Sequence, residues 1–98
     1  MYPAQKVWLP CKVGAGMFST EMAVQIQLED EKPVSLFADS SLITEIDGQT
    51  YLSVTLLGDN GKPKHKTILL PSECFETGSR WLSVRGDVLK EDLHSAAA

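Results

Sequence analysis

The 98-residue chain has no apolar run near the ~20 residues that a membrane-spanning helix needs. Its first residues, MYPAQKVWLPC, lack the basic and then apolar layout of a secretory signal peptide. We therefore expect a cytoplasmic protein without a membrane partner. This length leaves room for one compact domain, which we expect to span residues 1–94 and to be followed by a disordered tail at residues 95–98.

Side chains that commonly bind metals or act as nucleophiles are scarce, and all the cysteines and histidines are Cys11, Cys74, His65 and His94. No Cys-x-x-Cys pair or zinc-ligand spacing connects them. The charges of Glu73 and Glu76 would raise the pKa of the Cys74 thiol, whereas a catalytic cysteine needs a lowered pKa. The chain also lacks a Gly-x-Ser-x-Gly motif, a P-loop and a dinucleotide-binding motif. We expect no metal site, no cofactor and no enzymatic activity.

Apolar residues recur at every second position in several stretches, which is typical of β-strands with one buried face. The residues expected to face the core are Val7, Leu9, Cys11 and Val13, then Met22, Val24, Ile26 and Leu28, then Leu52, Val54 and Leu56. Asp47-Gly48 fits a two-residue type I′ turn between two such stretches. Counting the segments gives about seven or eight short strands at the spacing of sandwiches and barrels.

We therefore predict an all-β fold. It is a small, partly closed barrel or a sandwich, built from sequential antiparallel hairpins, with a short frayed C-terminal tail. The strand order and any contact between the two cysteines stay open.

Three large aromatic residues fall on the faces opposite the apolar stripes of their strands: Trp8, Tyr51 and Trp81. Together with Arg80 they would offer stacking and cation–π contacts to a partner. Alternatively, loops or a second copy of the chain would cover them. Because the chain shows surfaces but no assembled chemistry, we predict a non-enzymatic binding or interaction module with a protein or peptide partner. Self-association and membership of a larger assembly stay open.

The formal net charge of -4 hides an asymmetry along the chain. Residues 21–59 hold eight acidic residues against one lysine, whereas residues 60–85 hold Lys62, Lys64, Lys66, Arg80 and Arg85 against two acidic residues. The alternative function is therefore weak single-stranded nucleic-acid binding by a basic patch of Lys62, Lys64, Lys66 and Arg85. An acidic chain makes nucleic acid the less favoured partner. Pro63 cannot donate to a strand ladder, so this lysine-rich stretch fits a loop or a protected sheet edge better.

One segment resembles a known family. Residues 68–75, ILLPSECF, are similar to the Pro-Ser-x-Tyr segment that leads into the last strand of SH3 domains. The acidic and aromatic loop motif expected near the start of an SH3 domain is absent from KVWLPCKVGAGMF. The resemblance implies an SH3-like local geometry, a strand followed by a tight turn, without a groove for proline-rich peptides.

Overall fold

The computed structural model describes residues 5–16, 19–28, 32–59, 61 and 63–91. Their regular structure is all strand apart from two 3₁₀ turns, η1 (Ser40–Leu42) and η2 (Gly86–Val88), which confirms the all-β prediction. The strands are β1 (Gln5–Ala15), β2 (Glu21–Ile26), β3 (Val34–Asp39), β4 (Ile43–Ile46), β5 (Gln49–Asp59), β6 (His65–Leu69) and β7 (Trp81–Arg85). None of the described segments is a helix that could cross a membrane. The tail predicted at residues 95–98 lies outside the described residues.

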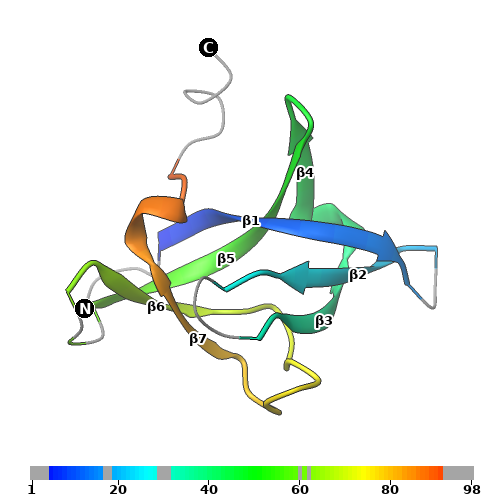
Figure 1. Cartoon of the computed structure of the whole chain (residues 1–98). Coiled ribbons are helices and arrows are strands. Elements are labelled where there is room, and N and C mark those ends of the chain that lie inside the picture. The colour runs from blue at the N-terminus through cyan, green and yellow to red at the C-terminus, as the bar shows by residue number, and fades with distance from the viewer. Residues whose placement is uncertain (1–4, 17–18, 29–31, 60, 62, 92–98) are drawn as a thin grey trace.

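All seven strands belong to one antiparallel sheet that curls into a half-barrel (Figure 1). Its order is β3-β2-β1-β5-β6-β7, and β4 pairs with the first part of β5. The long strand β1 pairs with two different strands along its length: residues 5–11 pair with β5, and residues 12–15 pair with β2. This change of partner along β1 lets the sheet turn around a single core.

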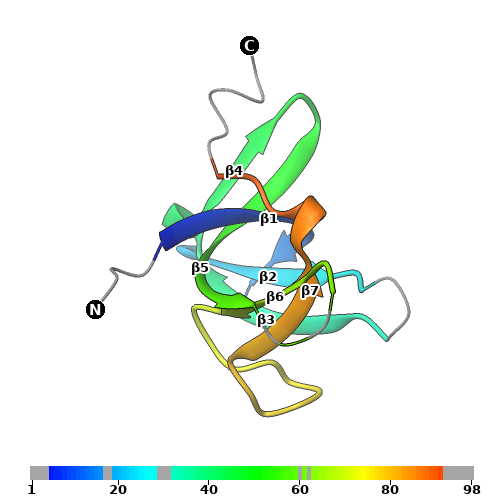
Figure 2. The same ribbon diagram turned by 90° about the vertical axis from the view of Figure 1, so that its left-hand side faces the viewer.

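The hairpin of β4 and β5 has the predicted two-residue turn. Asp47 and Gly48 have φ angles of 52° and 82°, which are the left-handed values of a type I′ turn. Ile46 and Gln49 pair directly on either side of it. Figure 2 shows this green hairpin projecting beyond the rest of the sheet.

The core lies on the inner face of the curled sheet. Its members are the buried residues Val7, Leu9, Cys11, Val24, Ile26, Leu28, Val34, Leu36, Ala38, Leu52, Val54, Ile68, Leu70, Cys74 and Val84. The alternation therefore predicted most of the core contributed by β1, β2 and β5. The exceptions are Met22 and Leu56, which are only half-buried, and Val13, which is 36% exposed. The prediction is wrong at Val13 because β5 pairs with β1 only as far as Cys11, so that Val13 has a strand neighbour on one side only.

The loop between β6 and β7 lies along the outer edge of β3. The Phe75 N–H donates to the carbonyl of Ser35 at 2.9 Å, and the Ser35 N–H donates to Oε1 of Glu76 at 2.7 Å. The Ser72 hydroxyl donates to the carbonyl of Phe37. The edge of β3 is thus occupied by hydrogen bonds from this loop rather than by a seventh strand pair.

Candidate functional site

A cleft of about 380 Å³ opens between the end of β2 and the end of β7. Binding sites for small ligands and side chains commonly have volumes of about 300–1,000 Å³. The apolar residues that line it are Leu9, Pro10, Ile26, Leu28, Val84 and Val88. Because these residues come from β1, β2, the segment just after β2, β7 and η2, the cleft exists only in the folded chain.

The cleft opens beside Pro10, in the middle of β1. β1 pairs with β2 from Lys12 onward, and Trp8 exchanges two backbone hydrogen bonds with Lys90, at 2.8 and 2.9 Å. Pro10 lies between these two contacts. Because the backbone N–H and C=O groups of successive residues in a strand point to alternate sides, those of Trp8 and the carbonyl of Pro10 both point away from β5. Proline has no N–H, so the gap leaves no backbone donor unpaired at this position. A break in the strand ladder at Pro10 therefore positions the cleft.

Polar side chains line the cleft as well: Gln27, His65, Ser83, Arg85 and Asp87. Nη2 of Arg85 lies 2.6 Å from Oδ2 of Asp87, and both side chains are partly exposed. Such a surface ion pair adds little to stability. It does place a positive and a negative group side by side at the wall of an otherwise apolar cleft.

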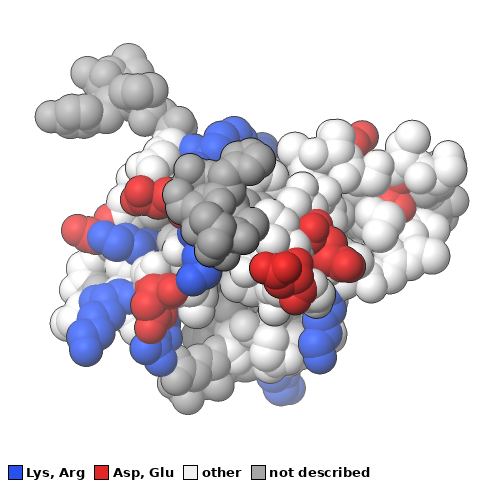
Figure 3. Space-filling model, turned by 90° about the horizontal axis from the view of Figure 1, so that it is seen from above, with Lys and Arg blue, Asp and Glu red and all other residues white. Residues whose placement is uncertain are grey.

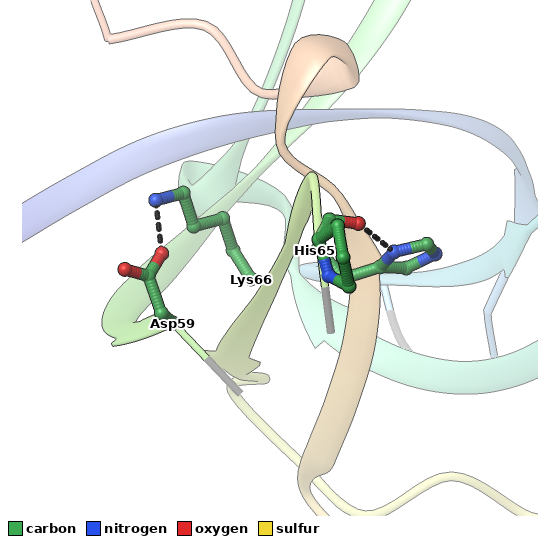
Figure 4. Close-up of polar contacts among 4 residues, drawn as sticks. Asp59, His65 and Lys66 are labelled. Carbon is green, nitrogen blue, oxygen red and sulfur yellow. Dashed lines mark hydrogen bonds and ion pairs between the residues drawn. The ribbon is translucent and has the colours of Figure 1, made fainter. Parts of the chain in front are cut away.

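His65 presents a defined hydrogen-bonding group to the cleft. Its Nδ1 lies 2.9 Å from the carbonyl oxygen of Pro63 (Figure 4). A carbonyl only accepts, so Nδ1 carries the hydrogen, and Nε2 of the neutral ring keeps its lone pair. His65 therefore acts as an acceptor at the cleft wall.

Sequence reasoning did not find this cleft. Ile26 and Leu28 were expected in the core, and both are buried there, but they also line the cleft. The signal that could have pointed to it is Pro10 inside an alternating strand, because proline interrupts a ladder.

The structure separates the four predicted contact residues into two groups. Trp8 pairs with Ser53 and Tyr51 pairs with Pro10, so Trp8 and Tyr51 are diagonal neighbours on the outer face of β1 and β5. Both are half-buried. Trp81 begins β7, two strands further round the sheet, and is 61% exposed. Arg80 is exposed, and its Nε donates to the carbonyl of Leu70 at 3.0 Å.

The basic patch does not form one uncompensated surface. Lys66 pairs with Asp59 (Figure 4), and Arg85 pairs with Asp87. Lys64 is exposed in the loop before β6, and Lys62 lies outside the described residues. On the face seen in Figure 3, Lys and Arg side chains are interspersed with Asp and Glu.

The prediction of a loop or a sheet edge for this stretch is confirmed in part. Pro63 and Lys64 lie in the loop between β5 and β6, whereas β6 starts at His65. Lys66 therefore belongs to a strand with β5 on one side and β7 on the other. The edge assignment is wrong for Lys66 because Pro63 precedes the ladder instead of interrupting it.

Both thiols are buried and neither forms a disulfide. Burial raises the pKa of the Cys11 thiol from 9.0 to about 11. Burial also raises the pKa of the Cys74 thiol, a hydrogen bond with Thr77 opposes this shift, and the charge of Glu76 adds to it. A raised pKa keeps a thiol protonated and poorly nucleophilic at neutral pH.

Comparison of the chain with protein-family models, with curated proteins and with solved structures finds no match. The resemblance of residues 68–75 to SH3 domains therefore stays a prediction. The cleft and the exposed aromatic residues are the surface features to which a proposed function can be assigned.

Proposed function

We propose that this chain is a non-enzymatic binding module that engages a protein or peptide partner, with the cleft between β2 and β7 as its main contact. The observation that carries the proposal is the cleft itself, an apolar hollow with a few polar groups along its wall. This combination suits a partner side chain, because apolar contact supplies affinity and a few polar groups supply orientation.

The nucleic-acid alternative receives less support from the same structure. Phosphate binding depends on several uncompensated cations along one surface. Lys66 and Arg85 are each paired with a carboxylate, which lowers the positive charge that a phosphate backbone would meet. A steep loss of affinity for a single-stranded oligonucleotide with rising salt would favour the alternative instead.

The proposal is tested with peptides selected from a displayed random library against the folded chain. We expect the selected synthetic peptides to shift the NMR methyl resonances of Leu28, Val84 and Val88. Val88 is 37% exposed in η2, so Val88→Arg should place a long charged side chain at the cleft and weaken binding roughly tenfold or more.

Val13→Arg is the matched control, because Val13 is 36% exposed and lies on β1 outside the cleft lining. It should leave the affinity unchanged. If Trp81→Ala abolishes binding while Val88→Arg does not, the outer aromatic surface is the contact and the cleft is not. A library that yields no binder would contradict the proposal as a whole.

A further inference from the structure

The cleft wall offers a hydrogen-bond acceptor that a ligand could use. Nε2 of His65 has its lone pair, because Nδ1 already donates to Pro63. A ligand that covers Nε2 without donating to it loses free energy, since a buried acceptor without a partner is costly.

The charged side chains at the cleft wall restrict which hydrogen-bond donor a ligand can bring. A lysine or arginine side chain of a partner would meet the positive charge of Arg85, while the nearby Asp87 carboxylate is already engaged by Arg85 at 2.6 Å. A partner carboxylate would have to displace Asp87 to reach the guanidinium. A neutral group with an N–H donor on an apolar body avoids both costs.

Resting on the proposed function, we propose that the cleft receives a tryptophan side chain of the partner, and that its indole N–H donates to Nε2 of His65. Indole is the side-chain group that combines a large apolar ring with a donor and no acceptor. Leucine and phenylalanine bring no donor, and the amide of glutamine brings little apolar area. Tryptophan also anchors many protein interfaces in pockets of this kind.

The test compares two small probes, N-acetyl-tryptophanamide and its 1-methylindole derivative, which lacks only the N–H. Both are titrated into the methyl-labelled full chain in mildly alkaline buffer, where an imidazole is neutral. We expect both probes to shift the methyl resonances of Leu28 and Val84, with the methylated probe binding about 3- to 10-fold more weakly. In His65→Leu, which removes the acceptor, the two probes should bind equally.

The outcomes separate this inference from the proposed function. Equal binding of the two probes to the wild-type chain overturns the inference alone, and so does a preference that persists in His65→Leu. Tighter binding of N-acetyl-lysinamide than of the tryptophan probe also overturns it, since that would assign the cleft to a cation. If no probe moves the cleft resonances, the inference and the proposed function fail together. The amide spectrum of His65→Leu reports whether the variant is folded.

Discussion

Cys11 shows how the direction of one side chain sets its chemistry. It occupies the inner face of β1 and is 6% exposed. Its pKa of about 11 follows from burial, because a thiolate loses its hydration in the core. Trp8, three positions earlier, points to the opposite face and is only half-buried. The parity of a position along β1 therefore separates an inert thiol from a ring that a partner can reach.

The raised pKa of Cys11 predicts a loss of stability in alkali. The pKa of the thiol is 9.0 in the unfolded chain and about 11 in the folded chain. As the pH rises, the unfolded state therefore loses this proton first. The buried thiol therefore contributes fully to the free energy of unfolding below pH 9, and this contribution is lost as the pH rises through the window between the two pKa values. Between about pH 8 and pH 10, which covers the first half of this window, we expect the free energy of unfolding to fall by about 1 kcal/mol more in the wild type than in Cys11→Val. Urea unfolding at a series of pH values measures this, and parallel curves would contradict it.

Among the elements, β3 illustrates how an outermost strand is protected. It stands first in the sheet order, so one of its edges has no strand neighbour. The β6–β7 loop covers that edge, and the Phe75 ring packs edge-on against Phe37 with 5.0 Å between centroids. Covering an edge in this way prevents strand pairing between molecules.

Glu76 is the residue through which this protection can be tested. The backbone hydrogen bond from Ser35 lowers the pKa of Glu76 below its ordinary value of 4.5. The ionised carboxylate therefore keeps this hydrogen bond above pH 4.5, and its stabilising effect is lost as the pH falls through the lowered pKa. We expect Glu76→Ala to speed hydrogen exchange of the Ser35 amide about 3- to 10-fold at neutral pH. Glu73→Ala, a neighbouring exposed carboxylate, should leave that rate unchanged. Unchanged exchange in Glu76→Ala would show that the bond contributes nothing.

The alternation of apolar residues predicted where strands lie but not which strands meet. It placed Val24 and Ile26 of β2 in the core because burial on one face follows directly from period two. It failed beyond Leu56, where a bulge shifts the register, Leu57 is 42% exposed and Gly58 has a φ of 134°. Pro10 marks a break in the ladder, but the cleft also depends on Trp8 pairing with Lys90. That long-range contact carries no local pattern.

At the scale of the whole molecule, the described chain is joined near its two ends. Trp8 of β1 and Lys90, just after η2, exchange both of their backbone hydrogen bonds. Leu89 packs against the core beside this contact. The C-terminal segment therefore occupies the edge of β1 that β2 leaves open, and it borders the cleft.

This arrangement predicts a sharp boundary for truncation. A chain that ends at Leu89 loses both hydrogen bonds with Trp8 and should be about 1–3 kcal/mol less stable than the full chain. A chain that ends at Glu91 keeps them and should differ by less than about 0.5 kcal/mol. Urea midpoints of the three chains measure the difference. Equal stability of the two truncated chains would show that the contact with Lys90 does not hold the barrel together.

The contact of Trp8 with Lys90 has a consequence for biosynthesis. A ribosome makes Trp8 long before Lys90, so this flank of β1 stays without its partner while the residues between them are made. During that wait the flank offers the N–H of Trp8 but none at Pro10, so a neighbouring nascent chain has one hydrogen-bond donor fewer to pair with. The same imino acid that leaves a hollow in the finished protein thus makes the unfinished one a poorer template for misassembly.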